Sequence, residues 1–319
     1  MDTTYKKIKT ALNKAEKEGR FNVPDSSPVE IDSDAKLTFA VFGDPQVSSV
    51  GPHRSINFKS ACSDLANMEK PYDALVIAGD VAEFGREVEY RLTAEILNDV
   101  ADKFVYFLAV PGNHDIRGRN FSSQLARFND FVRSVNGGIP AGDEHYWFSR
   151  EINGYKFIMM GTDKTKIEES YISPEQLSWL DSELEANDKS GKPCFVFNHQ
   201  TLKLHNGLPN TWQTNDKWRG SVGDQSEKIR RIFLRHKNIF FITGHLHWGT
   251  SEYTFQDYGS YKCLSVPAVG ATNHGEYSPN SQSFIISVYE DKVVLRSRVF
   301  SEGRYAEENV INSNITIIF

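Results

Sequence analysis

The sequence PGNHD occupies residues 111–115 and directly follows the apolar run FVYFLAV at residues 104–110. Seven residues rich in Val and aromatic side chains, closed by a Pro-Gly pair, predict a buried strand that ends abruptly. The turn after this strand holds an amide, an imidazole and a carboxylate in succession, in Asn113, His114 and Asp115. These groups supply lone pairs and a proton, so this strand end is the first candidate for a chemical site.

Four other apolar runs end in a similar way. Residues 37–42 are followed by GDPQ, residues 74–78 by GDVAE, residues 195–197 by Asn-His, and residues 239–243 by GHLH. The polar residues at these ends are Asp44, Gln46, Asp80, Glu83, Asn198, His199, His245 and His247. Because the carboxyl ends of parallel strands meet at one edge of a sheet, we expect a site assembled at such an edge.

The composition is that of a globular protein. The 319 residues are enough for one large α/β domain or two smaller ones, and 39% hydrophobic with 12% aromatic residues supports a substantial core. The formal net charge is −6, and acidic and basic residues are mixed along the chain without a long basic stripe. We therefore expect no long nucleic acid as a partner.

The cysteines indicate a reducing compartment. Cys62, Cys194 and Cys263 are far apart and form no C-x-x-C pair, which predicts free and mostly buried thiols. No apolar run is long enough to span a bilayer, and no signal-peptide pattern is seen near residue 1. We expect a cytoplasmic protein without membrane association, although a chain whose signal peptide had been removed would look the same. The sequence does not indicate an oligomeric state.

The chain divides into a short N-terminal region and one long domain. Residues 4–18 carry apolar side chains at helical spacing among Lys and Glu, which predicts an amphipathic helix packed on the outside of the protein. Residues 22–36 contain Pro, Asp and Ser and predict a connector. We therefore expect residues 1–36 to form a helix and connector, and residues 37–319 to form the main domain.

From residue 37 onward, short apolar runs alternate with helical patterns, which indicates βαβ units and a largely parallel sheet. The pair Asn153-Gly154 lies between two apolar runs and predicts an antiparallel hairpin. Residues 250–319 are mostly strand-like, and we expect them to complete a second sheet. The predicted fold class is α/β, with two mixed β-sheets packed together and helices outside.

The strand-end residues can together hold two divalent metal ions, which need hard or borderline ligands and usually one bridging carboxylate. One ion could bind Asp44, Asp80 and His247, and the other Asp80, Asn113, His199 and His245, so that Asp80 would bridge them. A mixed nitrogen and oxygen set without thiolate suits Mn, Fe or Zn better than copper(I).

The ordered motifs G-D-x-Q, G-D-x-x-E, G-N-H-D, N-H and G-H-x-H resemble those of the calcineurin-like metallophosphoesterase superfamily, over about residues 38–250. The resemblance implies a four-layer αββα fold, a dinuclear metal centre, and hydrolysis of phosphate esters by a metal-bridging hydroxide. It also implies that His114 binds the phosphoryl group and helps the leaving oxygen depart.

Gln46 departs from the family pattern, which usually has His two residues after the first Asp. A Gln oxygen can bind a metal, but more weakly than imidazole, and it cannot transfer protons near neutral pH. We therefore expect the first ion to be bound more loosely, or to be a harder ion such as Mn. Glu83 is interpreted either as support for a ligand or as a ligand itself. Asp115, grouped with His114 as catalytic, either orients His114 or caps the helix that follows.

Three residues are candidates for binding substrate. The long segment 205–220 follows His199 and contains Trp212, and Trp248 follows the last ligand His. Their rings could stack on a flat group, or they could pack the loops onto the domain. Arg117 could bind a phosphate through two N–H groups, or it could be solvated.

Three functions of different classes remain open. The leading hypothesis is a metal-dependent phosphoesterase of a small phosphorylated substrate, either a monoester or a diester. The second is a nucleotide or cyclic-nucleotide phosphodiesterase, which the aromatic residues near the site favour. The third is a non-catalytic scaffold of the same fold. Only Gln46 points to the scaffold, because His114 and the other ligands are present.

Overall fold

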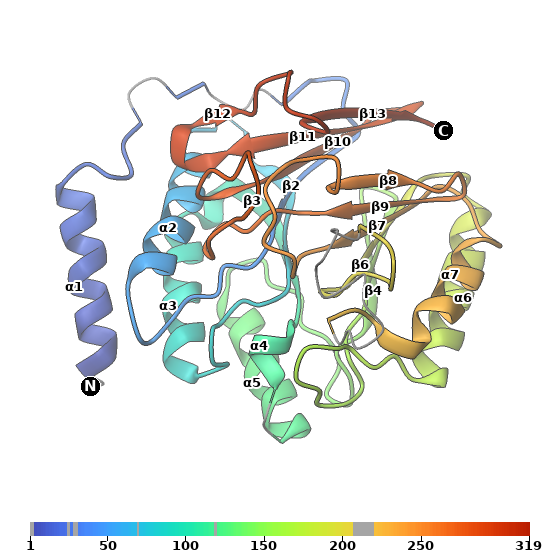
Figure 1. The fold of residues 1–319 in the computed structure, drawn as a ribbon, viewed down its shortest axis with the longest axis horizontal. Helices are drawn as coiled ribbons and strands as arrows, with labels where there is room; N and C mark the ends of the chain where they lie inside the picture. The colour runs from blue at the N-terminus through green and yellow to red at the C-terminus, as the bar shows by residue number, and fades with distance from the viewer. Residues whose placement is uncertain (1–2, 24–25, 28–30, 69, 118–119, 207–219) are drawn as a thin grey trace.

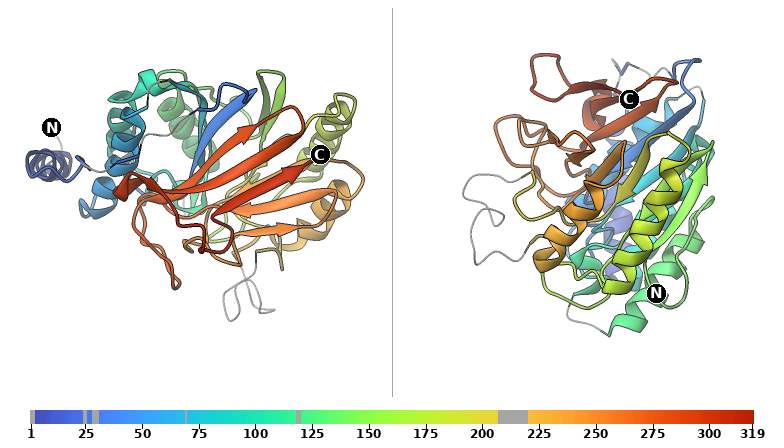
Figure 2. Two further views of the ribbon diagram at one scale, coloured as in Figure 1. Left: turned by 90° about the horizontal axis from the view of Figure 1, so that it is seen from above. Right: turned by 90° about the vertical axis from the view of Figure 1, so that its right-hand side faces the viewer.

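Two β-sheets lie face to face with helices on their outer sides (Figures 1 and 2). The computed structural model describes residues 3–23, 26–27, 31–68, 70–117, 120–206 and 220–319. This arrangement confirms the predicted α/β fold class, a sandwich of two mixed sheets flanked by helices.

The first sheet has the strand order β12-β11-β10-β1-β2-β3, and β13 pairs with β11 off this path. Its strands are β1 (Leu37–Phe42), β2 (Tyr72–Ala78), β3 (Phe104–Val110), β10 (Gln282–Val288), β11 (Lys292–Val299), β12 (Arg304–Tyr305) and β13 (Asn314–Ile318). The strands β1, β2 and β3 are parallel, and β10 runs antiparallel to β1. The carboxyl ends of β1, β2 and β3 therefore point to one edge.

The second sheet has the order β4-β5-β6-β7-β9-β8. Its strands are β4 (Phe148–Ile152), β5 (Tyr155–Met159), β6 (Cys194–Phe197), β7 (Ile239–Thr243), β8 (Phe255–Asp257) and β9 (Tyr261–Ser265). The strands β5, β6, β7 and β9 are parallel. The predicted hairpin joins β4 to β5, and Asn153 and Gly154 both have positive φ, as a tight hairpin turn requires.

The C-terminal strands do not all complete the second sheet, so this expectation was wrong. Only β8 and β9 join it, whereas β10 to β13 belong to the first sheet. In β10, Phe284 and Ile286 face the core between the sheets, and Ile285 faces the helices. A strand buried on both faces fits either sheet, so long-range pairing with β1 decides its place.

The helices cover the outer faces of both sheets. The first sheet is covered by α2 (His53–Ala66), α3 (Glu87–Asn98) and α5 (Phe121–Ser134), and the second by α6 (Pro174–Asp188) and α7 (Ser226–Phe233). The single-turn helix α4 (Asn113–Ile116) follows β3. Three short 3-10 helices, Ala101–Lys103, Gly223–Gln225 and Phe300–Glu302, complete the elements of the described residues.

The N-terminal helix α1 (Thr3–Lys17) lies outside α2 and α3 (Figure 1). It buries Ile8, Leu12 and Ala15, which are part of the predicted apolar stripe. Tyr5 donates a hydrogen bond of 2.6 Å to Glu95 of α3. The helix is therefore anchored to the domain, while the division of the chain at residue 36 stays a prediction. None of the helices in the described ranges is long and apolar enough to cross a membrane.

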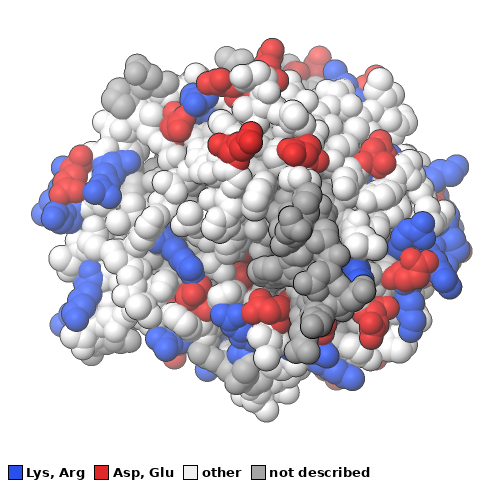
Figure 3. Space-filling view, viewed as in Figure 1, with Lys and Arg blue, Asp and Glu red and all other residues white. Residues whose placement is uncertain are grey.

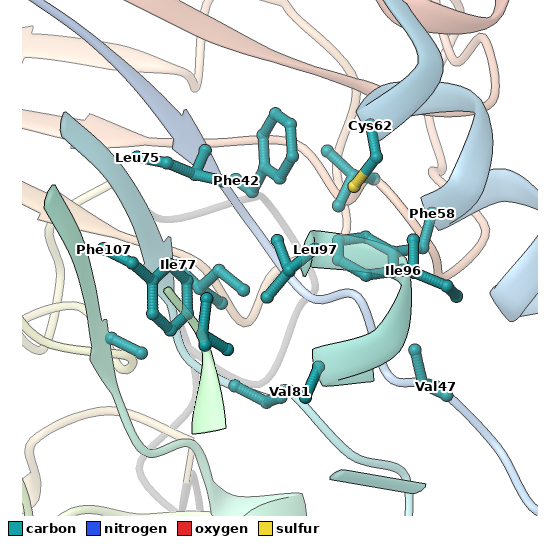
Figure 4. Packing of buried hydrophobic residues seen from close by; sticks show 14 of the residues in the cluster. Phe42, Val47, Phe58, Cys62, Leu75, Ile77, Val81, Ile96, Leu97 and Phe107 are labelled. Atoms are coloured by element: carbon teal, nitrogen blue, oxygen red, sulfur yellow. The ribbon is translucent and has the colours of Figure 1, made fainter. Parts of the chain in front are cut away.

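Alternation along the strands divides the core into layers. In β1, Phe39 and Val41 face the core between the sheets, whereas Ala40 and Phe42 face the helices. This follows from the two-residue repeat of a strand, and it explains why all of β1 is buried. Figure 4 shows the helix side of this core, where residues of β1, β2 and β3 meet α2 and α3.

Candidate metal centre

The predicted ligands come together at the carboxyl ends of strands from both sheets. Asp44, Asp80 and Asn113 follow β1, β2 and β3 of the first sheet. His199 follows β6, and His245 and His247 follow β7 of the second sheet. The expectation of a site at one edge of a single sheet is corrected accordingly: the two packed sheets each supply part of the ligand set.

Five of the candidate ligands have left-handed backbone conformations. Positive φ angles occur at Asp44 (47°), Gln46 (40°), Asp80 (50°), His245 (75°) and His247 (48°). Each such residue other than glycine costs on the order of 1–3 kcal/mol and persists only where its surroundings enforce it. The enforcing bonds include the backbone N–H of His245, which donates to Asp44 Oδ2 at 2.9 Å. Strain of this kind is concentrated at functional sites.

One group of ligand atoms surrounds His199. Its Nε2 lies 3.2 Å from Asp80 Oδ2, 3.1 Å from Asn113 Oδ1 and 3.1 Å from His245 Nδ1. Its Nδ1 lies 2.9 Å from the Ala78 carbonyl oxygen, which can only accept, so Nδ1 donates and Nε2 is the nitrogen that can offer a lone pair to a metal ion once it is deprotonated. Four atoms with lone pairs thus converge, an arrangement that fits a cation at their centre.

A second group contains Asp44, Asp80 and His247, whose ligand atoms all lie within 4.8 Å of one another. His247 Nε2 is 3.0 Å from Asp44 Oδ1. Gln46 donates from Nε2 to Asp80 Oδ2 at 3.0 Å, which orients its amide. Its buried Oε1 has no hydrogen-bond partner among the residues that the structure describes. A buried carbonyl oxygen without a partner is costly, so this atom fits a metal ligand.

Asp80 is common to both groups and is therefore placed to bridge two ions. Its Oδ1 accepts a hydrogen bond of 2.8 Å from the backbone N–H of His114. Two ligand groups that share one carboxylate match the predicted division of ligands. The donor set contains carboxylate, amide and imidazole, which suits Mn, Fe or Zn.

The surroundings of the candidate ligands shift the pKa values of His199 and His245 in opposite directions. Burial opposes protonation of His199, but the Asp80 carboxylate outweighs it and raises the pKa of His199 to about 9. Burial and the neighbouring His199 hold the pKa of His245 well below its usual value. Metal binding requires deprotonated ligands, so divalent ions compete with these protons.

His114 is held beside the ligand groups by the segment after β2. Its Nδ1 lies 2.9 Å from the Glu83 carbonyl oxygen and 3.3 Å from the Glu83 carboxylate, while its Nε2 lies 3.9 Å from Asp80 Oδ2. Glu83 also pairs with Arg54. These contacts support the interpretation of Glu83 as a residue that holds His114, and they leave Nε2 on the side of the metal ligands.

Arg117 also lies beside His114, with Nη2 3.1 Å from Nδ1. The two neighbours of Nδ1 have opposite requirements, because the Glu83 carbonyl can only accept and the guanidinium can only donate. The Glu83 contacts are an acceptor and a carboxylate, so we place a proton on Nδ1. The second nitrogen of the guanidinium, Nη1, donates to Glu168 at 2.9 Å.

Asp115 makes contacts that organise the loops. Its carboxylate accepts from the backbone N–H groups of Gly112, Val81 and Ala82 at 2.8–3.1 Å and from the Tyr90 hydroxyl at 3.0 Å. It therefore joins the ends of β2 and β3 below the site. The bond from the Gly112 N–H caps α4, which is one of the two roles expected for Asp115, and none of these partners is His114. A catalytic role of Asp115 stays a prediction.

The predicted substrate residues are only partly placed. Trp248 is half-buried directly after His247, and its backbone pairs with that of His274. Trp212 lies outside the described residues. The roles of Trp248, Trp212 and Arg117 in substrate binding stay predictions.

Two residues that support the site, Glu89 and Glu168, were not predicted from the sequence. Glu89 is fully buried and accepts from Ser49, Phe84 and Arg86, which ties the loop after β1 to the loop after β2. Glu168 accepts from Asn113 and Arg117. The only sequence signal for Glu89 is an acidic residue in the first turn of a helix, and Glu168 carries none.

The segment after β9 supports the loop that carries Asp44. The Gly43 carbonyl accepts from the Val269 N–H at 2.8 Å, and the Asp44 carbonyl accepts from Gly270 at 3.3 Å and Ala271 at 3.1 Å. Farther along, the His274 N–H donates to the His247 carbonyl at 2.7 Å. The loop between β9 and β10 therefore contacts the backbones of Asp44 and His247, two members of the second ligand group.

Comparison with known families agrees with this geometry. The family model of calcineurin-like phosphoesterases matches residues 37–249. The chain belongs to the calcineurin-like phosphoesterase family. The matched range contains every ligand of both groups, and it ends before the C-terminal loop that supports Asp44.

Two of the relatives that match this chain are distant in sequence. A glycerophosphodiester phosphodiesterase, GpdQ, of Enterobacter lignolyticus is 22% identical over 184 residues, 57% of this chain and 61% of the relative. A manganese-dependent ADP-ribose/CDP-alcohol diphosphatase of Xenopus laevis is 28% identical over 134 residues, 42% of this chain and 33% of the relative. The matches thus span between one third and about three fifths of these relatives.

Solved structures share the fold. A dimetal phosphatase from Danio rerio superposes with a TM-score of 0.62 at 16% identity, covering 89% of this chain and 99% of that one. The purple acid phosphatase of yellow lupin gives a TM-score of 0.59 at 14% identity, covering 88% and 53%. At these identities the comparison supports the fold and not a particular substrate.

Proposed function

We propose that this protein hydrolyses a phosphodiester bond of a small substrate with the help of two divalent ions, Mn, Fe or Zn. The observation that carries the proposal is the pair of ligand groups that share Asp80, with His114 beside them. A binding scaffold would have no need for an imidazole oriented beside such a pair.

Each residue has a role in this proposal. Asp44, His247 and Gln46 would hold one ion, His199, His245 and Asn113 the other, and Asp80 both. When bound, the two ions would activate a water molecule as nucleophile and neutralise phosphate charge. His114 acts from Nε2, donating a proton to the phosphoryl group or to the leaving oxygen, while Glu83 holds Nδ1. Arg117 donates to a phosphate oxygen.

The choice of a diester over a monoester rests on the relatives. Two of them are named as glycerophosphodiester phosphodiesterases, one of these only as probable, and the Xenopus relative is named as a diphosphatase of ADP-ribose and CDP-alcohols. A diphosphate that carries a nucleoside is the second candidate substrate. Trp248 next to His247 supports it, because an indole can stack on a base.

The test is hydrolysis by metal-stripped protein supplied with Mn²⁺, Zn²⁺ or Fe²⁺. The substrates are nitrophenyl phosphate, bis-nitrophenyl phosphate and ADP-ribose. We expect metal to restore turnover, with the diester preferred over the monoester, and His114→Ala to lower kcat by about 10²–10⁴-fold while both ions still bind. Stoichiometric metal binding without turnover of any of these substrates would contradict the proposal and favour the scaffold.

We further propose that the protein works in a reducing compartment such as the cytoplasm. The three cysteines are buried and free, which supports this proposal.

On the face shown in Figure 3, basic and acidic side chains alternate in small groups, and this pattern supports a small substrate in preference to a polynucleotide.

A further inference from the structure

We propose that Glu168 is a positioning residue that orients the metal ligand Asn113 and the phosphate-binding candidate Arg117 at the same time. Nothing in the motifs assigns a role to this residue, which lies between β5 and α6. The inference rests on the proposed function of the metal centre, which it deepens.

The two contacts use different oxygen atoms, so both can exist together. Glu168 Oε2 accepts from Asn113 Nδ2 at 2.9 Å, and Oε1 accepts from Arg117 Nη1 at 2.9 Å. Asn113 and Arg117 are the first helical residue and the C-cap residue of the single-turn helix α4. One carboxylate thus spans the helix that also carries His114.

The first contact decides which end of the Asn113 amide faces the metal ligands. Because Nδ2 donates to Glu168, Oδ1 is directed to the other side, 3.1 Å from His199 Nε2. If the amide turned over, its NH₂ group would face the ligand group, and an NH₂ group cannot bind a cation. A hydrogen bond of this kind to a ligand tunes metal affinity.

The second contact places the guanidinium beside His114. Arg117 Nη2 lies 3.1 Å from His114 Nδ1 while Nη1 is held by Glu168. The side chains of Arg117 and Glu168 are 33% and 32% exposed, so the pair contributes little to stability. Its value is geometric, because the contacts to Glu168 and His114 fix the plane of a guanidinium that can donate to an anionic substrate.

Glu168 is itself fixed by the opposite side of the site. Its backbone carbonyl accepts from Gln200 Nε2 at 2.9 Å, and Gln200 directly follows the ligand His199. Two residues later, the Ser170 N–H donates to the Ser221 carbonyl at 3.3 Å. The segment around Glu168 therefore joins the end of β3 in the first sheet to the end of β6 in the second, and it fixes both halves of the ligand set relative to each other.

The test compares Glu168→Ala and Glu168→Gln with a matched control. Glu169→Gln changes the neighbouring residue, which is 29% exposed and pairs with Lys166 instead. Calorimetric titration of metal-stripped protein with Mn²⁺ gives affinity and stoichiometry, and kinetics on bis-nitrophenyl phosphate gives kcat and KM. Thermal unfolding verifies that each variant folds.

We expect Glu168→Ala to lower the affinity for one of the two Mn²⁺ ions by about 10–100-fold and to raise KM for the anionic diester. In Glu168→Gln the single amide oxygen can replace one of the two contacts, so a smaller loss is expected. Glu169→Gln should behave as wild type.

The binding measurement separates this inference from the proposed function. Glu168→Ala protein that binds both Mn²⁺ ions with wild-type affinity overturns the inference, whatever its activity. Wild-type protein that binds two Mn²⁺ ions but hydrolyses no ester overturns the proposed function, and a loss of affinity in Glu168→Ala would still support the role of Glu168 toward Asn113. Wild-type protein that binds none of Mn²⁺, Zn²⁺ and Fe²⁺ overturns both.

Discussion

Gln46 combines a left-handed backbone with a buried side chain that has one end occupied. Its N–H and its Nε2 both hydrogen-bond Asp80, at 2.8 and 3.0 Å, and φ is 40°. These bonds hold the amide, and its buried Oε1 has no hydrogen-bond partner among the described residues. An amide oxygen is a harder ligand than imidazole, so we expect a site in which Gln46 is a ligand to favour a harder ion such as Mn²⁺.

Replacing Gln46 tests this bias. We expect Gln46→Ala to lower the affinity for one of the two Mn²⁺ ions by about tenfold or more, because a ligand is lost. In contrast, Gln46→His should raise the affinity for Zn²⁺ relative to Mn²⁺, since imidazole suits zinc better. Competition titrations with a chelator of known affinity measure both effects. If Gln46→Ala bound two Mn²⁺ ions as wild type does, Gln46 would not be a ligand.

Gly112 allows the close approach of the β2 and β3 loops. A Cβ atom at this position would lie 2.1 Å from Asp80 Oδ1 and 2.4 Å from the Asp80 backbone nitrogen. We expect Gly112→Ala to displace Asp80, destabilise the protein by about 1–3 kcal/mol, and lower metal affinity at both ions. Urea unfolding and Mn²⁺ titration measure these effects.

The matched control is Gly51→Ala, in the loop after β1. A Cβ there meets nothing within 4 Å, so neither stability nor metal binding should change. Equal behaviour of the two alanine variants would refute the argument from close approach.

The residues that could be predicted from sequence are those that follow an apolar strand, because the strand end announces them. Glu168 and Glu89 could not be predicted in this way. Their partners Asn113 and Ser49 lie 55 and 40 positions away, and a single carboxylate without periodic context carries no information about such contacts.

At the scale of elements, apolar runs predicted the strands well and their pairing poorly. The observed bounds of β1 and β3 agree with the apolar runs at residues 37–42 and 104–110. The sheet to which β10 belongs was not predictable, since both of its faces are buried and only its partner β1, some 245 positions earlier, decides it. Local pattern determines the element, whereas tertiary pairing determines the sheet.

The contact between α6 and the end of α7 predicts a pH dependence of stability. His236 is 7% exposed and lies 2.8 Å from Asp181 and 2.7 Å from Asp188, and Arg235 also pairs with Asp181. Burial favours the neutral imidazole, but the hydrogen bonds to both aspartates outweigh it and raise the pKa of His236. The folded state therefore binds this proton more tightly than the unfolded state.

A raised pKa stabilises the protein fully below the unfolded value, about 6.5, and the contribution is lost as pH rises through the folded value. We expect His236→Gln to lower the free energy of unfolding by about 1–3 kcal/mol at pH 6, as for hydrogen bonds to charged groups, and by less at pH 9. Urea unfolding at both pH values measures the difference from wild type. The exposed His53, changed to Gln, is the control, and a difference independent of pH would show that the His236 contact does not depend on its charge.

At the scale of the whole molecule, the candidate metal centre is built from segments between residues 43 and 274. The family match ends at residue 249, yet the loop between β9 and β10 contacts Gly43, Asp44 and His247. This loop connects β9 of the second sheet to β10 of the first, at the edge where the candidate ligands are found. The C-terminal region therefore completes the first sheet with β10 to β13, and its loop between β9 and β10 supports the site.

Asn273 is the residue that gives this loop its shape. Its Oδ1 accepts from the Ala268 N–H at 2.8 Å, and its Nδ2 donates to the carbonyls of Ala268 at 2.9 Å and Pro279 at 3.1 Å. Asn273 is buried and its side chain contacts none of the candidate ligands through these bonds. It connects the part of the loop that holds Asp44 to His274, which holds the His247 backbone.

Asn273→Ala leaves the two Ala268 groups and the Pro279 carbonyl without these partners. We expect a loss of about 1–3 kcal/mol in unfolding free energy, because buried polar groups become unsatisfied. Since Asp44 and His247 are then less fixed, one Mn²⁺ should also bind more weakly in calorimetric titration. Asn280→Ala, at an exposed position of the same loop, should change neither quantity. A variant that loses stability but binds Mn²⁺ as wild type would mean that the loop supports the fold and not the metal centre.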